Sequence, residues 1–203
     1  MIRLNKKYPI LSFGEFVSKN KPTQWEQLPA KISAESRLHI LCNEQDCICG
    51  YSEIPLEEDT SSSHIDHYYK RSLFPEKTFD WNNLIVSTTD EDFGGKYKDN
   101  TYKIKAEDYQ LIFNPVVDDM SQYIEFSRNG EIVPLKGSSD NIFKKVQKTV
   151  EVFNLNCRSL KNRRRDFIYQ LDNCKDLPKN EIKAAFASNG FVSVLNWFLK
   201  VTK

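Results

Sequence analysis

The sequence lacks the features that would direct a protein to a membrane or to the secretory pathway. No apolar run among its 203 residues is long enough to span a bilayer, and the segment Met1–Lys7 is not the continuous hydrophobic stretch of a secretory signal. The five cysteines are odd in number and, without a sign of secretion, are better explained as reduced thiols than as a disulfide framework. We therefore expect a cytoplasmic protein that binds no membrane.

An excess of charge of either sign is also missing. The 29 Lys and Arg residues against 28 Asp and Glu residues give a formal net charge of +1 at pH 7. Any attraction to nucleic acid must therefore come from local clusters of basic residues. The clusters are Lys70–Arg71, Lys96 with Lys98, and Arg163–Arg165. Each is equally typical of a solvated face, and for the arginine triplet that explanation competes with phosphate or partner binding.

What the sequence does contain is a short motif that holds two of its three histidines, His64-Ile65-Asp66-His67. On an extended strand His64 and Asp66 share one face and His67 takes the opposite face. After a turn-like segment, Trp81–Val86 predicts a second strand that carries the side-chain amide of Asn83. The two strands together predict a hairpin.

The motif suggests metal-assisted cleavage of a phosphodiester bond. An imidazole can take a proton from water while a neighbouring carboxylate holds a divalent cation against the phosphate. An Asp-His pair by itself is more often part of a surface strand with incidental imidazoles. The order of His64–His67, Trp81–Leu84 and Gly95–Asp99 is more informative, because it matches the HNH type of nuclease site.

The chain resembles the PtuB family, the HNH effectors of Septu and retron-linked anti-phage systems. The resemblance rests on the order of segments along nearly the whole chain: Glu44–Glu53, His64–His67, Phe74–Pro75, Trp81–Leu84, Gly94–Asp99, Asn114–Asp119, Asn129–Pro134 and Thr149–Arg163. It implies an α+β fold with a ββα-metal nuclease core. It also implies a separate SMC-like or ABC-type ATPase, PtuA, as partner, since this chain has no Gly-x-x-x-x-Gly-Lys phosphate loop. A retron reverse transcriptase with its noncoding DNA would belong to the same system.

The resemblance also implies roles for individual residues. His67 would be the general base, Asp66 a metal ligand and Asn83 an amide that braces the loop carrying the base. Lys96, Lys98 and Arg71 would contact the substrate phosphates. The metal ligands would be Asp66, His64 and Asp92 with Mg²⁺ or Mn²⁺, although Asp90–Asp92 is also typical of a solvated acidic loop.

Two departures from the family pattern are visible. Gly95 stands where the helix of an HNH site supplies an Asn or His ligand, and a glycine has no side chain to offer. Where a structural zinc would be held by two Cys-x-x-Cys pairs, the chain has Cys49-x-x-Ser52, Thr88 and Gly94. Cys42 and Cys47 lie near Cys49 in sequence but would need a distant fourth ligand, so we expect no structural zinc.

The chain divides into a lead-in segment at 1–43, the nuclease core at 44–100, a β-rich arm at 101–137 and a helical region at 138–203. A helix is expected near 33–43 and short strands at 109–113, 123–126 and 131–133, with a hairpin turn at Asn129-Gly130. Helical spacing links Phe143, Val146, Val150 and Phe153, and a second helix covers Leu160–Leu171. Pro178 separates a third helix, whose apolar end at 191–199 is expected to pack partly on the core and partly on a partner.

The sequence therefore supports a metal-dependent HNH endonuclease acting on DNA or RNA. The phosphate chemistry does not distinguish the two, and no base-reading pattern is present. The alternative is a catalytically weakened HNH-like module that docks and regulates a partner ATPase. The missing ligand at Gly95 and the altered zinc positions are the features that keep that alternative open.

Overall fold

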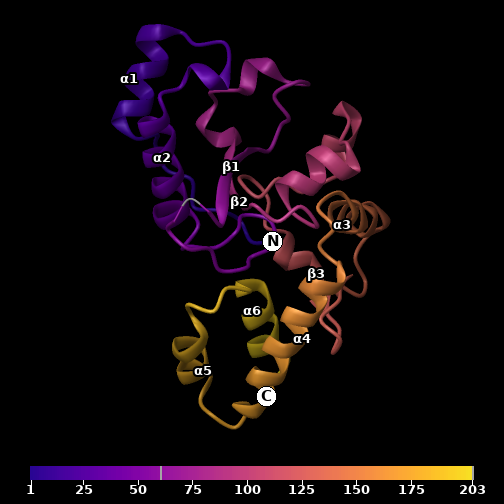
Figure 1. The fold of residues 1–203 in the computed structure, drawn as a ribbon. Coiled ribbons are helices and arrows are strands. Elements are labelled where there is room, and N and C mark those ends of the chain that lie inside the picture. Colours follow the sequence, from indigo (N-terminus) through magenta and orange to yellow (C-terminus); the bar gives the residue numbers. More distant parts are fainter. Residues whose placement is uncertain (60, 203) are drawn as a thin grey trace.

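The computed structural model describes residues 1–59 and 61–202 and combines helices with small antiparallel sheets, as an α+β fold requires (Figure 1). The segment at 44–100 contains the hairpin of β1 (Ser63–His67) and β2 (Leu84–Thr88), with α1 (Leu11–Asn20) and α2 (Ala30–His39) beside it. The remaining elements are β3 (Ile124–Phe126), β4 (Ile132–Pro134), α3 (Asp140–Val152), α4 (Arg158–Asn173), α5 (Lys179–Phe186) and α6 (Val192–Val201). Shorter 3₁₀ or π-helical turns cover Trp25–Gln27, Ile40–Glu44, Pro75–Lys77, Trp81–Asn83, Tyr97–Tyr102, Ala106–Gln110 and Met120–Tyr123.

The β1–β2 hairpin has a register that pairs Asp66 with Ile85 and His67 with Leu84. The second strand begins later than predicted, because Trp81–Asn83 form a 3₁₀ turn. The carboxylate of Asp80 accepts the backbone N–H of Asn82 and so satisfies a donor at the start of that turn. Every residue of β2 is buried, which places this hairpin inside the molecule.

A side chain, not a strand, joins the loop before β1 to the edge of β2. Gln45 accepts the backbone N–H of Val86 at 2.8 Å and donates to the carbonyl of Val86 at 2.9 Å. The amide of Gln45 thus replaces a backbone pair of a third strand. Gly50 adds a backbone hydrogen bond to the same carbonyl, which brings the Cys49–Ser52 turn against the hairpin.

The arm at 101–137 agrees with the sequence in part. Strands β3 and β4 and the turn between them are confirmed, and Gly130 has the positive φ of 82° that favours glycine. A Cβ on Gly130 would lie 2.1 Å from the carbonyl of Lys161, so the turn packs directly on α4. The predicted strand at 109–113 is wrong. Tyr109 lies in a 3₁₀ helix whose first N–H, that of Lys105, is accepted by the carboxylate of Asp108.

The helical region has one more helix than expected. Pro178 precedes α5, and the chain then turns at Gly190 and Phe191, both with positive φ, before α6. The expected helical spacing is confirmed for Val146 and Phe153, which are buried, whereas Phe143 is 44% exposed. The apolar residues of α6 mostly pack inside the protein, where Val194, Leu195 and Phe198 are buried. This helix therefore offers a partner less apolar surface than the sequence suggested.

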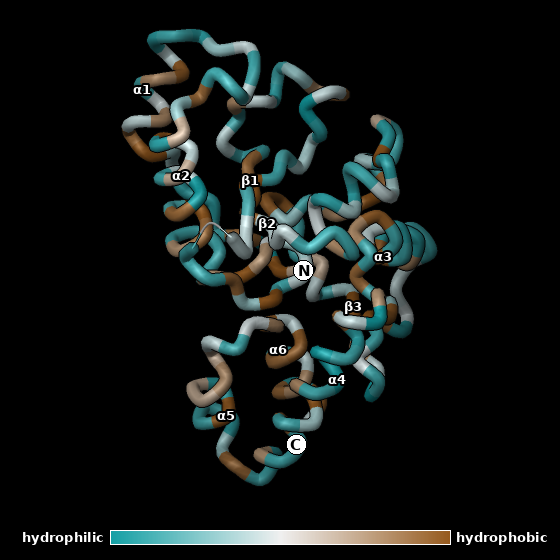
Figure 2. Tube along the Cα trace, viewed as in Figure 1, coloured by the Kyte–Doolittle hydropathy of each residue, from teal (hydrophilic) through white to brown (hydrophobic). Residues whose placement is uncertain are grey.

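Buried side chains from all parts of the chain form one continuous hydrophobic cluster. Figure 2 shows hydrophobic residues along β2 and α6, while much of α3 is hydrophilic. The helix α1 was not predicted, because its N-terminus has no side-chain cap and of its residues only Phe13 is fully buried. In the described part of the chain, none of the helices combines the length and the apolar character needed to cross a membrane.

The middle member of the arginine triplet has a structural role. Arg164 is 2% exposed, and its guanidinium donates to the carbonyls of Gly130 and Leu155 and to the side chain of Asn156. It therefore joins the β3–β4 turn to the connection between α3 and α4. Burial lowers the pKa of Arg164 to about 10, which still leaves the group charged at neutral pH.

Replacing Arg164 should destabilise the fold more than replacing its exposed neighbour. We expect Arg164→Met to lower the free energy of unfolding by about 3 kcal/mol, because buried carbonyls lose their donors. Arg163→Met, at an exposed position, should change it by less than about 0.5 kcal/mol. Guanidinium unfolding of both variants measures the difference. Equal stability of the two would contradict a structural role for Arg164.

Candidate active site

The residues of the His-Ile-Asp-His motif meet at one cavity of about 420 Å³. His64, Asp66 and His67 all line it, together with Gly95 and Lys96 from the segment after β2. The sequence placed His67 on the face opposite to Asp66. In the structure His67 is the last residue of β1, and the cavity lies where the strand ends, so both side chains reach it.

His67 is held in one orientation by its surroundings. Its Nε2 lies 2.9 Å from the carbonyl oxygen of Thr78, which accepts only, so Nε2 carries the proton and Nδ1 keeps a lone pair. The ring of Trp25 packs edge-on against the imidazole, with centroids 4.7 Å apart. Burial lowers the pKa of His67 to about 4 and outweighs the attraction of Asp66. The imidazole is therefore neutral at pH 7, the state that a general base requires.

Asp66 is 5% exposed and is held by two donors. The hydroxyl of Tyr51 donates to Oδ2 at 2.5 Å, and the ammonium of Lys98 lies 3.3 Å from the same oxygen. Burial and the nearby carboxylate of Asp66 raise the pKa of Tyr51, which keeps this hydroxyl protonated. The contacts to Oδ2 leave Oδ1 as the oxygen that adjoins Gly95.

Lys98 is buried and is not among the residues that line the cavity. Its side chain is fully buried, and its ammonium donates to the carbonyl of His67 at 2.8 Å and contacts Asp66 and Asp99. Burial alone would lower the pKa of Lys98, but attraction to the two carboxylates raises it, so the group is a buried cation. The sequence-based role as a substrate contact is replaced by one in positioning Asp66.

Gly95 is packed against the carboxylate of Asp66. A Cβ at this position would lie 2.7 Å from Oδ1 and 2.5 Å from Cγ of Asp66. The N–H of Gly95 donates to Oγ of Ser87 at 3.1 Å, which fixes the approach of the helix to β2. The site therefore has no room for the Asn or His that the family pattern places here.

Asn83 ties the loop after β1 to the hairpin. Its Oδ1 accepts the N–H of Tyr69 at 2.6 Å, and its Nδ2 donates to the carbonyls of Tyr69 and Lys77. The side chain is buried, so these bonds are shielded from water. Thr78, the partner of His67, follows Lys77 directly. By binding Lys77, Asn83 thus helps to keep the carbonyl of Thr78, which accepts the N–H of His67, in position.

His64 is the less constrained of the two histidines in the motif. It is half-buried on the cavity wall, and burial lowers its pKa as well. Its Nδ1 is buried without a hydrogen-bond partner among the described residues. No oxygen, nitrogen or sulfur ligand set that includes His64, Asp66 and Asp92 comes together in the described chain.

Asp92 lies outside the cavity. It is exposed, its N–H bonds to the side chain of Asp90, and its carbonyl accepts from Asn154. The Asp90–Asp92 segment is therefore a solvated acidic loop, and the expected metal ligand Asp92 is corrected accordingly. The sequence alone could not distinguish the two, because acidic loops and oxygen ligands have the same composition.

The remaining basic residues predicted to bind substrate lie at the rim of the cavity. Lys96 is partly exposed and pairs with Glu91 at 3.5 Å, while Arg71 pairs with Glu26 at 2.9 Å. Such exposed ion pairs contribute little and break readily in favour of a phosphate. Lys70, also on the rim, donates to the carbonyl of Asp99.

Sequence reasoning missed two residues of this site. Asp99 lines the cavity four residues after Gly95, one helical turn along, and that spacing could have identified it. The ammonium of Lys98 contacts both Asp99 and Asp66, and burial together with the neighbouring Asp66 raises the pKa of Asp99. Tyr51 is contributed by the Cys49–Ser52 turn. No local sequence signal connects it with Asp66.

The positions expected to have lost a structural zinc site are filled by other contacts. Cys49 is buried, with its sulfur 3.7 Å from Oγ of Ser87. Ser52 belongs to the same turn, and Gly94 has a positive φ, with Oγ of Ser87 only 2.9 Å from where a Cβ would stand. Thr88 ends β2 and accepts the N–H of Asp90. The contacts seen here are hydrogen bonds and close packing.

Comparison with known proteins gives a relative for the chain but no family profile. No protein-family profile matches the chain. The chain is 24% identical over 212 residues to a protein of Escherichia coli named "Retron Ec83 putative HNH endonuclease". The aligned region covers 86% of this chain and 81% of that protein. This similarity supports an HNH endonuclease in a retron context.

Acidification should destabilise the fold through His67. Its folded pKa of about 4 lies below the unfolded value of about 6.5, so at intermediate pH the unfolded chain binds a proton that the native chain does not. Stability therefore falls as the pH drops from 7 to 5, by about 2 kcal/mol from this group. Urea unfolding at both pH values should show a loss smaller by that amount in His67→Gln. An equal loss in both proteins would contradict a neutral buried imidazole.

Proposed function

We propose that this chain is a metal-dependent HNH endonuclease that hydrolyses phosphodiester bonds of nucleic acid. The observation that carries the proposal is the meeting of His67, Asp66 and Lys96 at one cavity, at the end of the β1–β2 hairpin. The similarity to the retron protein from Escherichia coli supports the same chemistry.

His67 is the proposed general base. Its Nε2–H is committed to Thr78, so the lone pair of Nδ1 is the one available to take a proton from water. The depressed pKa keeps that lone pair free at neutral pH. Asn83 holds the loop in place, and the edge-on ring of Trp25 holds the imidazole. Because both are positioned before the reaction, less conformational entropy is lost when the proton is transferred.

The carboxylates at the cavity fit a divalent cation such as Mg²⁺ or Mn²⁺. Asp66 and Asp99 place two carboxyl groups beside the single ammonium of Lys98, so the cluster contains more oxygen ligands than Lys98 contacts. Oxygen ligands from one or two carboxylates, completed by water and phosphate, are what Mg²⁺ prefers. When bound, the ion would neutralise charge on the phosphate and on the leaving oxygen. His64 is placed to support this group or the base.

Lys96 and Arg71 are the proposed phosphate contacts. Both lie on the cavity rim, and both are paired there with carboxylates of the same surface, Glu91 and Glu26. A phosphate that displaces these carboxylates would bind across the mouth of the cavity, facing His67. Arg71 suits the contact because a guanidinium presents two parallel donors to phosphate oxygens.

We further propose that the nuclease acts as the effector of an anti-phage system. The resemblance to the PtuB family implies a partner ATPase of the SMC-like or ABC type, PtuA, which would hold the nuclease in check or deliver it to substrate. The name of the Escherichia coli relative adds a retron, with its reverse transcriptase and noncoding DNA, as a setting for such a complex. The helical region at 138–203, which contains α3–α6, is the segment proposed to contact the ATPase.

One observation favours the alternative of a catalytically weakened interaction module. Tyr51 and Lys98 already satisfy Oδ2 of Asp66, and Gly95 offers no side-chain ligand. A carboxylate that is neutralised inside the protein has less need of an external cation. Under this alternative the hairpin serves as a scaffold, and the chain regulates an ATPase without cutting.

Nuclease assays on variants of the two histidines distinguish these proposals. We expect His67→Ala to reduce cleavage of DNA or RNA at least about 100-fold in the presence of Mn²⁺, because the base is lost. His39→Ala, at a histidine that does not line the cavity, is the matched control and should cut as the wild type does. If His67→Ala does not fold, His67→Gln replaces it. Wild-type cleavage by a folded His67 variant would exclude this residue as the base.

Binding of nucleic acid by an inactive His67→Gln background tests the rim. Lys96→Ala and Arg71→Ala should each weaken binding and reduce the slope of log Kd against log salt by about one. Glu26→Gln should strengthen binding, because it releases Arg71 from its ion pair. Lys19→Ala, at an exposed position on α1, is the control. If the slope of log Kd against log salt is unchanged in both Lys96→Ala and Arg71→Ala, the substrate phosphate does not bind at this rim.

A further inference from the structure

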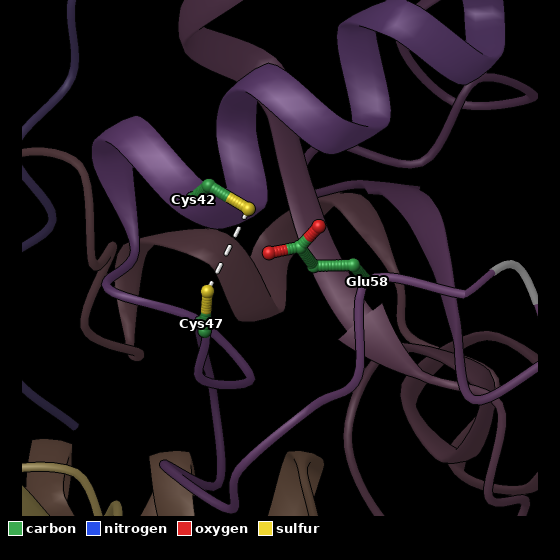
Figure 3. Close-up of side chains that lie close together, drawn as sticks. All are labelled: Cys42, Cys47 and Glu58. Carbon is green, nitrogen blue, oxygen red and sulfur yellow. Dashed lines mark hydrogen bonds between the residues drawn. The ribbon is translucent and has the colours of Figure 1, made fainter.

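Two cysteines and a glutamate come together away from the nuclease cavity, at the end of α2 (Figure 3). Cys42 lies in the π-helical turn Ile40–Glu44, Cys47 in the turn that follows, and Glu58 in the segment leading to β1. The sulfurs of Cys42 and Cys47 are 3.6 Å apart, and one ligand oxygen of Glu58 lies within 4.8 Å of both. In Figure 3 the carboxylate points toward the two sulfurs.

The separation of the sulfurs matches a shared metal better than a disulfide. Two thiolates bound to one tetrahedral zinc at about 2.3 Å lie about 3.7 Å apart. A disulfide requires a sulfur–sulfur distance of about 2.05 Å, so the pair would have to close by more than 1 Å. Cys42 and Cys47 are therefore already near the spacing that zinc imposes.

The backbone at Asp46 and Cys47 adopts an unfavourable conformation that supports this arrangement. Asp46 and Cys47 both have positive φ, 49° and 57°, although neither is a glycine. The N–H of Cys47 bonds to the carbonyl of Leu41, and its carbonyl accepts the N–H of Leu56. These bonds hold the strained turn so that the thiol of Cys47 faces Cys42. Strain of this kind is typical of functional positions.

The local charge also suits an anionic ligand set. Arg37 is 7% exposed, and its guanidinium donates to Oγ of Ser63 at 2.6 Å and to the carbonyl of Glu58 at 2.5 Å. Among residues 1–59 and 61–202 it forms no ion pair with a carboxylate, and its buried Nε has no hydrogen-bond partner. Two thiolates, one carboxylate and a divalent cation would carry a net charge of −1, which Arg37 would balance.

An open route leads to the cluster. Cys42 and Glu58 line a cavity of about 600 Å³ that is separate from the nuclease cavity and faces solvent. A metal ion bound by three protein ligands there would keep one position for water. That coordination, with two sulfurs and one oxygen, is suited to Zn²⁺ and poorly suited to Mg²⁺.

We propose that Cys42, Cys47 and Glu58 form a zinc-binding site that fastens the end of α2 to the segment leading into β1. The sequence led us to expect no structural zinc because Cys42, Cys47 and Cys49 would together need a distant fourth ligand. Cys49 instead points toward Ser87, and Glu58 takes the third position. The site lies outside the nuclease cavity, so the zinc proposal does not depend on whether the chain hydrolyses nucleic acid.

Titration of the reduced full chain with Co²⁺, followed by Zn²⁺, tests the site. We expect one Co²⁺ per chain with a thiolate-to-cobalt charge-transfer band, which the oxygen and nitrogen ligands of the nuclease cavity do not produce. Zn²⁺ should displace it. Cys42→Ser and Cys47→Ser should abolish the band, and Glu58→Gln should weaken binding about tenfold while keeping it. Cys174→Ser, at a cysteine remote from the cluster in sequence, should match the wild type.

Three outcomes would overturn the proposal. The first is a reduced wild-type chain that gives no thiolate band with Co²⁺. The second is a band that survives in both Cys42→Ser and Cys47→Ser. The third applies if the serine variants do not fold: X-ray absorption of the zinc-loaded wild type that finds fewer than two sulfur neighbours. A Cys42–Cys47 disulfide formed with oxidised glutathione, without metal uptake after reduction, counts as the first outcome.

Discussion

The buried carboxylate of Asp66 is the point on which the arrangement of the nuclease segment depends. It receives a hydroxyl from the turn before β1 and an ammonium from the helix after β2, and the backbone of Gly95 packs against it. Two segments that are distant in sequence, the turn with Tyr51 and the helix with Gly95 and Lys98, are therefore fixed against β1 by one charged group. Because a buried charge without partners is strongly unfavourable, removing Tyr51 or Lys98 would affect more than a single contact.

The same group links stability to chemistry. A carboxylate held by fixed donors keeps its position, which is needed if it is to face a cation or a phosphate. The neutral imidazole of His67 stands next to it with one nitrogen committed to Thr78. The cavity thus contains a fixed negative group and a fixed neutral base, and the mobile positive groups are confined to the rim at Lys96 and Arg71.

The sequence was informative where chemistry depends on neighbouring positions. The His-Ile-Asp-His motif, the hairpin partner with Asn83 and the turn at Asn129-Gly130 are short-range signals, and each appears in the structure as a local feature. The helices with clear apolar spacing, such as the one containing Leu160 and Leu171, were also predictable. The catalytic and binding roles of these residues remain predictions.

Long-range contacts account for what the sequence did not show. Lys98 looked like a surface cation because charge alone gives no sign of burial, and only the fold places it beside Asp66. The apolar run at 109–113 is compatible with either a strand or a buried turn. The turn forms because the carboxylate of Asp108 accepts the backbone N–H of Lys105. The approach of Glu58 to Cys42 and Cys47 depends on how two loops cross, which no spacing rule describes.

The contact between Gly95 and Asp66 has a consequence for how this protein can change by mutation. An Asn at position 95 would restore the family pattern, but its Cβ would overlap the carboxylate that Lys98 and Tyr51 hold in place. A single substitution there damages the site before it can add a ligand. The two arrangements are therefore separated by at least two simultaneous changes, one at Gly95 and one among the partners of Asp66. A side chain that could act as a ligand therefore cannot be introduced at position 95 by one substitution without disturbing Asp66.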